Sequence, residues 1–238
     1  MAKRSKGYLE TVERLEPTRD YPPADAVALA KELARARFDE TVELHMRTAA
    51  DTRHAEQLVR GVVVLPHGVG KQVRVLAFAE GETAEIARLA GADYVGADDL
   101  IKKIEEGWVE FDVAVATPPI MGRIGRLGRV LGRKGLMPNP RTGTVVAPED
   151  LPRVISEAKL GRVEYRMDKT GIIHCPIGKA SFPKEHLMEN FSALVDAVMR
   201  ARPAAIKGRF LSSAYLCTTM GPGIRLDVNA LTTIKAEL

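Results

Sequence analysis

The chain has 238 residues, of which 45% are hydrophobic and only 5% aromatic, which suits one large domain or two small ones with cores of Val, Leu, Ile and Ala. No apolar run approaches the roughly 18–20 residues that cross a membrane. The two cysteines give no disulfide framework, so we expect a cytoplasmic protein without a membrane segment.

Charge is unevenly distributed along the chain. The formal net charge is +4, but residues 80–112 hold ten acidic and three basic side chains, which leaves +11 on the remainder. Such asymmetry is typical of a protein that turns one surface to a polyanion. An acidic helical face that only keeps the protein soluble would explain the acidic segment but not the basic remainder.

The N-terminal part changes from helical to extended patterning. Residues 1–16 are basic but lack the apolar stretch of a secretory signal, which favours a solvated or RNA-touching arm. Two prolines precede an alanine-rich helix over residues 24–37. Polar and apolar residues alternate over 41–47, as in a half-buried strand, and residues 61–66 have the pattern of a more deeply buried strand.

The middle of the chain alternates short Val-rich strands with helices. We expect strands at 72–79, 93–96 and 111–116, and helices at 83–90, 97–107 and 151–161. This order predicts a parallel α/β sheet. Beyond residue 162 the strands are longer and alternate, at 162–167, 172–178, 208–221 and 224–228, with a long helix at 184–203. We therefore expect an α/β unit inserted between two flanks of antiparallel style.

The stretch from Gly122 to Gly135 contains five glycines, five basic residues and no acid. A Walker-type phosphate loop does not fit nearby, because HGVGKQ at 67–72 has Leu65 where the first glycine is required and Gln72 in place of the hydroxyl. The even spacing of the glycines also lacks the dinucleotide fingerprint. Two interpretations stay open. The segment could lie along a nucleic acid backbone, which glycine and arginine favour, or it could be a solvated basic loop.

Catalytic and metal-binding patterns are not evident in the sequence. The five histidines are scattered without partners at metal-ligand spacing, and no nucleophile elbow or carboxylate pair stands out. His174 and Cys175 would point to opposite faces of a strand, and we interpret His174 as structural. We expect no cofactor, no metal and no enzymatic activity. The middle unit's architecture keeps a nucleotide-dependent enzyme as the alternative, although a fold does not confer a function.

Several segments together resemble the family of the large-subunit ribosomal protein numbered one. The first is IMGRIGRLGRVLGRKGLMPNPRTGTV. FDETVELHMR, LPHGVGKQVRVLAFA, GADYVGADDL, FDVAVATPPIMG, MDKTGIIHCPIGKASF and TTMGPGIRLD also match, in that family's order. The resemblance extends from about Tyr8 to Val228. Arg133 stands where many members have proline, which makes this loop more basic and less rigid.

The resemblance implies a fold of class α/β and α+β with two domains. Residues 1–67 and 160–238 would form domain I, a discontinuous α+β domain with an antiparallel sheet from both chain ends. Residues 68–159 would form domain II, an inserted three-layer α/β Rossmann-like domain joined by two hinge strands. The implied protein is a ribosome-associated monomer that binds the stalk region of 23S rRNA, helps release exit-site tRNA and represses translation of its own operon mRNA.

The resemblance also implies which residues face RNA. In domain I, Phe38 and Glu43 flank the first strand, and Ser213 and the triad Thr219, Met220 and Gly221 lie beside them. Further neighbours would be Arg37, Thr41, Arg166 and Lys169. Glu43 would accept a hydroxyl or amino donor, because a carboxylate repels phosphate. Domain II would add a secondary contact to the RNA backbone through its basic cluster, namely Arg123, Arg126, Arg129, Arg133 and Lys134.

Overall fold

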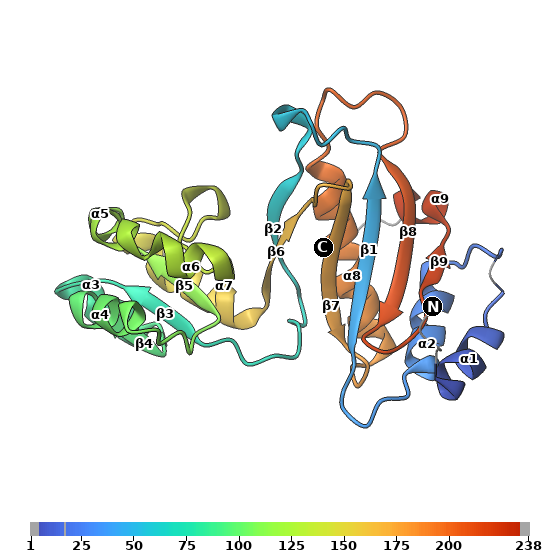
Figure 1. Ribbon diagram of the computed structural model, residues 1–238, viewed down its shortest axis with the longest axis horizontal. Helices are drawn as coiled ribbons and strands as arrows, with labels where there is room; N and C mark the ends of the chain where they lie inside the picture. The colour runs from blue at the N-terminus through green and yellow to red at the C-terminus, as the bar shows by residue number, and fades with distance from the viewer. Residues whose placement is uncertain (1–4, 17, 234–238) are drawn as a thin grey trace. The chain divides into compact units, whose positions relative to one another are not determined.

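The structure is a computed structural model that describes residues 5–16 and 18–233 (Figure 1). It divides into two compact units: unit 1 comprises Met1–Gly70 and Val163–Leu238, and unit 2 comprises Lys71–Arg162. The predicted fold class, with mixed helix and sheet in separate sheets, is confirmed. Among the described residues, no helix is both long and apolar enough to cross a bilayer.

Unit 1 is built on a four-stranded antiparallel sheet in the order β7-β1-β8-β9. The strands are β1 (Thr41–Thr48), β7 (Ile172–Lys179), β8 (Leu211–Thr218) and β9 (Ile224–Leu226). The predicted alternation in β1 is confirmed, because every second side chain is buried, beginning with Val42. Strand β1 from the N-terminal flank pairs with two strands of the C-terminal flank, so the sheet draws on both flanks.

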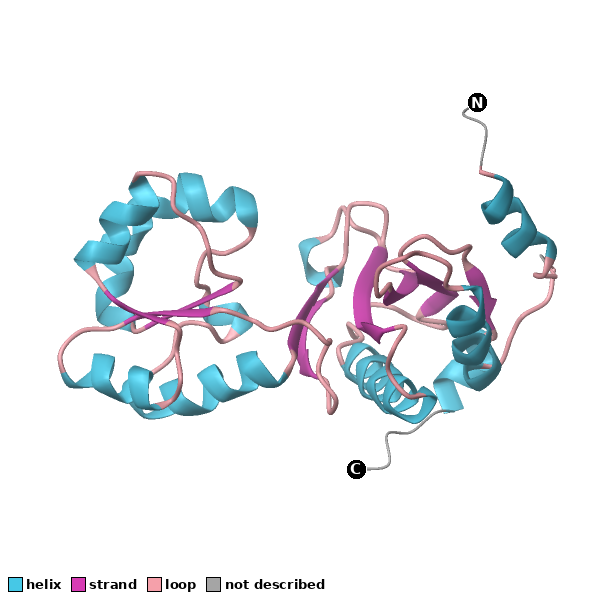
Figure 2. Ribbon diagram, turned by 90° about the horizontal axis from the view of Figure 1, so that it is seen from below, coloured by secondary structure: helices cyan, strands magenta, loops and turns pink. Residues whose placement is uncertain are grey.

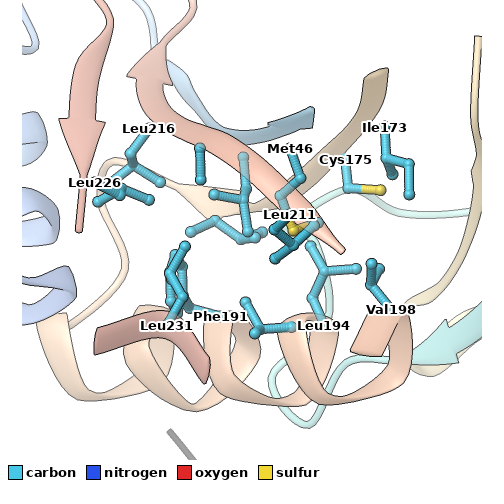
Figure 3. Close-up of a cluster of buried hydrophobic side chains, with 14 of the residues drawn as sticks. Met46, Ile173, Cys175, Phe191, Leu194, Val198, Leu211, Leu216, Leu226 and Leu231 are labelled. Carbon is cyan, nitrogen blue, oxygen red and sulfur yellow. The ribbon is translucent and has the colours of Figure 1, made fainter. Parts of the chain in front are cut away.

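One face of this sheet carries the core of unit 1. Helices α2 (Pro23–Leu33) and α8 (Lys184–Arg200) pack there, and Leu231 of α9 (Val228–Thr233) joins the same core. Figure 3 shows Phe191, Leu194 and Val198 of α8 pointing toward Met46 and Leu216 of the strands. Burial of such aliphatic and aromatic side chains is the main stabilising contribution to a fold of this kind. The odd-numbered side chains of β1 therefore point to the opposite, open face.

A separate two-stranded sheet pairs β2 (Arg60–Val64) with β6 (Arg162–Arg166). Gly61 is required at their contact, because a Cβ there would lie 2.3 Å from the Tyr165 hydroxyl oxygen. That hydroxyl donates a hydrogen bond to the carbonyl of Ala197 at 3.1 Å. The expected strand at residues 61–66 is confirmed over residues 61–64, but its expected deep burial is wrong, since Val63 is buried and Val64 is exposed. A two-stranded sheet has too few neighbours to cover both of its faces.

The N-terminal segment, expected to be a solvated or RNA-touching arm, contains a helix in which Thr11 is the buried residue. Helix α1 (Lys6–Glu13) begins after Ser5, whose hydroxyl accepts a hydrogen bond from the backbone N–H of Tyr8. This is ordinary N-capping, which satisfies a donor that the first helical turn leaves open. The first four residues of the predicted arm lie outside the described residues. A short helix η1 (Ala55–Gln57) follows β1.

Unit 2 has a three-stranded parallel sheet in the order β4-β3-β5, which confirms the predicted parallel pairing. Its strands are β3 (Val75–Phe78), β4 (Tyr94–Gly96) and β5 (Val113–Ala116). Helices α3 (Glu82–Leu89) and α7 (Leu151–Leu160) cover the face of Val75 and Ala77. Helix α4 (Asp98–Glu105) and the glycine-rich helices cover the other face, with Leu76 and Phe78 (Figure 2). Three layers result.

The glycine-rich segment forms consecutive short helices, not a loop. They are α5 (Met121–Ile124), η3 (Gly125–Leu127) and α6 (Gly128–Lys134), and they follow η2 (Pro118–Ile120). Ile120, Ile124, Leu127 and Leu131 are buried at spacings of three and four residues, so one face packs on the sheet. The helix ends at Gly135, whose φ of 71° is the left-handed conformation that favours glycine. The segment is therefore not a loop, whereas its two functional interpretations, contact with a nucleic acid backbone or exposure to solvent alone, stay predictions.

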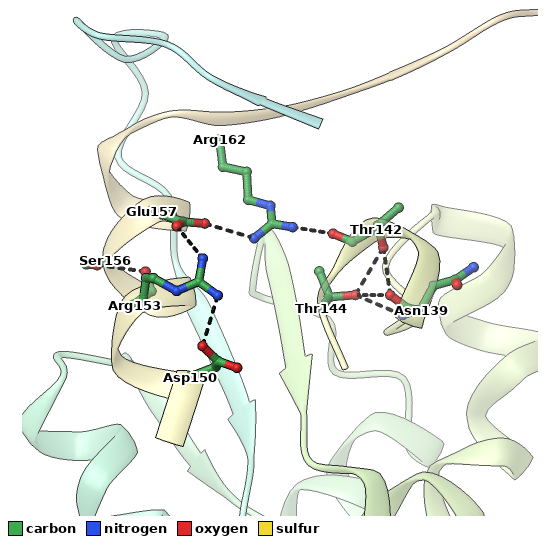
Figure 4. A network of polar contacts seen from close by, with 8 residues as sticks. All are labelled: Asn139, Thr142, Thr144, Asp150, Arg153, Ser156, Glu157 and Arg162. Atoms are coloured by element: carbon green, nitrogen blue, oxygen red, sulfur yellow. Dashed lines mark hydrogen bonds and ion pairs between the residues drawn. The ribbon is translucent and has the colours of Figure 1, made fainter. Parts of the chain in front are cut away.

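The C-terminal end of unit 2 is fixed by a polar network (Figure 4). Arg153 of α7 bonds to Asp150 at 2.9 Å and to Glu157 at 3.0 Å. Arg162 reaches Glu157 at 3.4 Å and donates to the carbonyl oxygen of Thr142. These contacts tie α7 to η4 (Pro140–Thr142), and η5 (Pro148–Asp150) leads into α7.

Candidate nucleic-acid interface

The open face of the unit 1 sheet gathers polar side chains from three strands. On β1 these are the side chains of Thr41, Glu43, His45 and Arg47, which alternate with buried residues. Glu43 stands opposite Cys217 of β8, and His45 stands between His174 of β7 and Tyr215 of β8. The face therefore offers hydroxyl, carboxylate, imidazole and cationic groups in a fixed register.

The triad lies at the end of β8, beside the start of β1. The backbone N–H of Thr41 donates to the Thr219 hydroxyl at 2.9 Å, and the N–H of Thr219 donates to the Thr41 carbonyl at 3.0 Å. Gly221 has no room for a side chain, because a Cβ would lie 2.4 Å from the Thr218 hydroxyl oxygen. Met220 remains 50% exposed and Phe38 57% exposed. Met220 thus presents an exposed apolar side chain on a turn that backbone hydrogen bonds hold, and Phe38 is exposed in the loop before β1.

A buried carboxylate connects this turn to the loop before β1. Glu40 is only 1% exposed, and its carboxylate accepts N–H bonds from Arg35 at 2.8 Å, Ala36 at 2.7 Å and Met220 at 2.9 Å. Burial acts to raise the pKa of Glu40, but these backbone donors together with the Thr218 hydroxyl outweigh it and hold the pKa below its ordinary value. The ionised Glu40 is therefore the group that sets the position of Met220.

Helix α1 contributes to the surroundings of the triad. Ser5, Tyr8 and Arg35 line a shallow pocket together with residues 219–221. The Arg35 guanidinium lies 5.8 Å from the centre of the Tyr8 ring and donates to the Ser5 hydroxyl at 3.3 Å. The pocket consequently combines a cation, an aromatic ring and hydroxyl groups next to Met220.

The predicted RNA-facing residues form two groups rather than one. Thr41, Glu43 and residues 219–221 gather at one end of the sheet, with Arg37 and Phe38 exposed in the loop before β1. The expectation that Ser213 lies beside Phe38 and Glu43 is wrong, because its register partner is Arg47 near the far end of β1, whereas Glu43 pairs with Cys217. Six residues of extended strand separate Ser213 from Thr219, about 20 Å.

The second group lies at that far end. Lys169 follows β6 in the turn to β7, and its carbonyl accepts a bond from the Thr52 hydroxyl at 2.9 Å. Gly171 of the same turn accepts the N–H of Thr48 at 2.8 Å, which fixes the turn against the end of β1. Arg166 is exposed at the end of β6. Cationic groups therefore occur near both ends of the sheet.

A cluster that sequence spacing did not reveal lies between these ends. His45 Nε2 is 3.1 Å from the Cys217 sulfur and 3.7 Å from a Glu43 carboxylate oxygen, and these three residues could hold a metal ion. Burial raises the pKa of the Cys217 thiol to about 11, with the Glu43 charge adding to the effect. The search for spaced histidines missed the cluster because its members come from neighbouring strands. The alternation in β1 did predict that Glu43 and His45 share one face of the strand.

The basic cluster of unit 2 is partly neutralised within the unit. Arg123 pairs with Glu80 and with Asp98, at 3.0 Å from the latter, and Arg126 pairs with Glu105 at 3.2 Å. For the remaining three cations, Arg129, Arg133 and Lys134, no acidic partner lies within ion-pair distance in the described part of the chain.

The glycines beside these cations have no packing reason to be glycine. A Cβ built on Gly122, Gly125, Gly128 or Gly132 would meet nothing within 4 Å. Glycine inside a helix costs roughly 0.5–1 kcal/mol relative to alanine. The segment therefore presents bare helical backbone next to three unpaired cations.

Comparison with known proteins agrees with the resemblance seen in the sequence. The pattern of the ribosomal protein L1p/L10e family matches residues 30–222. The large ribosomal subunit protein uL1 of Thermomicrobium roseum is 58% identical over 96% of this chain and 95% of its own length. The protein of the same name from Dehalococcoides mccartyi is 52% identical over 98% of this chain and 99% of its own length. The chain therefore belongs to the ribosomal protein L1p/L10e family.

Proposed function

We propose that this protein binds a folded stem-loop region of large-subunit 23S rRNA through unit 1 and takes a structural, non-enzymatic part in the ribosomal stalk. The observation that carries the proposal is the turn of residues 219–221, which backbone hydrogen bonds and the Glu40 carboxylate hold beside the start of β1. Membership of a ribosomal family supports it, and so do the names of the relatives, which describe those proteins as belonging to the large ribosomal subunit.

The chemistry of the face suits recognition of RNA by shape. Between Thr41 and Thr48 the strand extends about 23 Å, and the shallow groove of an A-form helix displays 2′-hydroxyl groups over such a distance. Glu43 accepts hydroxyl or amino donors, and the exposed Met220 and Phe38 pack on sugars or unstacked bases. Arg37, Arg166 and Lys169 neutralise phosphates near the two ends.

Unit 2 supplies a second contact in this proposal. Bare backbone at the four open glycines allows close approach to a phosphodiester chain, and Arg129, Arg133 and Lys134 supply unpaired positive charge. Arg123 and Arg126 contribute less, because each would first have to leave a carboxylate partner. The contact is electrostatic and carries no sequence information.

We extend the proposal to the two finer roles that the family resemblance implies. An operon mRNA that presents the same fold as the rRNA would occupy the same face, so repression would begin when free protein exceeds free rRNA. On the ribosome, the protein would move with exit-site tRNA and aid its release. Both roles use RNA recognition and need no catalytic group.

Filter binding with the stalk fragment of 23S rRNA and a scrambled RNA of equal length tests the proposal. We expect the stalk fragment to bind more tightly than the scrambled RNA at every salt concentration measured. Equal affinity for both RNAs would contradict specific recognition and leave a general scaffold. Equilibrium dialysis against ATP and NAD tests the alternative of a nucleotide-dependent enzyme, and binding of either would favour that alternative.

A further inference from the structure

Three side chains with different metal-binding atoms meet on the open face of the unit 1 sheet. Glu43 and His45 come from β1, and Cys217 comes from β8, directly opposite Glu43. One donor atom of each residue lies within 4.8 Å of the other two. Cross-strand neighbours on one face of an antiparallel pair approach this closely, so the sheet itself brings the donors together.

Two of the three donor separations are close to those of a tetrahedral site, and the third, between Glu43 and Cys217, is within 4.8 Å. Metal bonds of about 2.0–2.3 Å to nitrogen, oxygen and sulfur put neighbouring ligand atoms about 3.4–3.6 Å apart. His45 Nε2 is 3.1 Å from the Cys217 sulfur and 3.7 Å from the Glu43 oxygen. Shifts of about half an ångström, within the range of side-chain torsions, would bring both distances to those values.

A second pair of residues orients the imidazole. His45 Nδ1 lies 2.8 Å from Nδ1 of His174, and His174 Nε2 lies 3.6 Å from a carboxylate oxygen of Asp168. The carboxylate favours a proton on His174 Nε2, so His174 Nδ1 accepts the proton of His45 Nδ1. The lone pair of His45 is then on Nε2 and points to Glu43 and Cys217. Metal-binding histidines in proteins are oriented by outer hydrogen bonds of this kind.

We propose that Glu43, His45 and Cys217 form a binding site for a borderline-soft transition metal ion of the Zn²⁺ class. One thiolate, one imidazole and one carboxylate suit zinc or cobalt, whereas Mg²⁺ and Ca²⁺ require a set of oxygen ligands. Three protein ligands leave the fourth position open to water or another small ligand, as in zinc sites that are not purely structural. The proposal does not rest on RNA binding.

Titration of the reduced, full-length protein with Co²⁺ in the absence of RNA tests the proposal. Cobalt reports its ligands through thiolate-to-metal charge-transfer absorption and through the intensity of its visible bands, which are stronger in four-coordinate sites. We expect saturation at one equivalent, with both signals abolished by one equivalent of Zn²⁺ but unaffected by a large excess of Mg²⁺. Absence of the charge-transfer band would overturn the proposal.

Matched variants separate this site from binding to any thiol. Cys217→Ser should abolish the charge-transfer band, while Cys175→Ala should keep it, because Cys175 is buried on the other face of the sheet. His45→Asn keeps both thiols, and we expect it to weaken binding at least about tenfold. Retention of the wild-type affinity in His45→Asn, or in Cys217→Ser, would overturn the proposal; circular dichroism verifies the fold of each variant.

Discussion

Replacement of Glu40 by glutamine should loosen the turn that presents Met220. The substitution keeps size and shape but removes the charge and turns one acceptor oxygen into an NH₂ group. Oε1 of Glu40 accepts the N–H groups of Arg35 and Ala36, and Oε2 accepts that of Met220. A glutamine that keeps its oxygen toward the first two donors would point its NH₂ group at the N–H of Met220.

The expected cost follows from these three bonds. A hydrogen bond to a charged group contributes about 1.5–3 kcal/mol, and a buried donor left without a partner costs a similar amount. Loss of the Met220 bond and weakening of the other two should lower the free energy of unfolding by about 2–4 kcal/mol. Because Met220 is then no longer held, affinity for the stalk RNA should fall at least about tenfold.

Urea denaturation and filter binding measure the two effects in Glu40→Gln. Glu32→Gln is the matched control, since it removes the same charge from an exposed site whose partner Arg14 is 3.9 Å away. The control should change stability by less than about 0.5 kcal/mol. Equal stability of the two variants would refute the role assigned to Glu40. A destabilised Glu40→Gln that keeps full RNA affinity would refute the link from Glu40 to the RNA-binding turn.

Three further predictions concern other parts of the molecule. Gly132→Ala should stabilise the protein by about 0.5–1 kcal/mol in thermal unfolding, because the space is open, yet weaken RNA binding; destabilisation would contradict this. Arg129→Ala should lower the slope of log affinity for RNA against log salt concentration by up to about one unit. Arg126→Ala should lower it by less, because Arg126 is already paired with Glu105, and equal slopes for the two variants would show that this pair does not affect RNA binding. Hydrogen bonds, of which that from the Ile172 N–H contributes most, lower the pKa of Asp168 from 3.8 to about 2. The ionised Asp168 therefore stabilises the folded protein fully above pH 3.8, and this stabilisation is lost as the pH falls toward 2. The difference in free energy of unfolding between wild type and Asp168→Asn should shrink over that pH range, and a constant difference would contradict the assignment.

Local patterns predicted most of the elements and their faces. Alternation in residues 41–47 placed Leu44 in the core and His45 outside, as the structure has them. The same argument separated Cys175 from His174. The parallel sheet of unit 2 was predictable because its strands are short, apolar and separated by helices. Periodicity reports burial directly, so these inferences needed no knowledge of partners.

The features that could not be predicted depend on contacts between segments far apart in the sequence. Strand order puts β1 between β7 and β8, so Cys217 meets His45 although 172 residues separate them. The same register places Ser213 opposite Arg47, away from Glu43. In the sequence, Glu40 has the pattern of an ordinary exposed charged residue before a strand. Only the fold brings three backbone N–H donors to its carboxylate. Helix α1 was missed because a short capped helix has little apolar content of its own.

The affinity of a doubly substituted protein, Thr219→Ala with Met220→Val, for the stalk fragment of 23S rRNA tests the central claim most directly. The substitutions remove the hydroxyl that accepts the Thr41 N–H and shorten the exposed side chain at the turn. We predict a dissociation constant at least about tenfold higher than that of the wild type, in protein shown to be folded. An unchanged dissociation constant would contradict the claim that unit 1 recognises RNA through this turn.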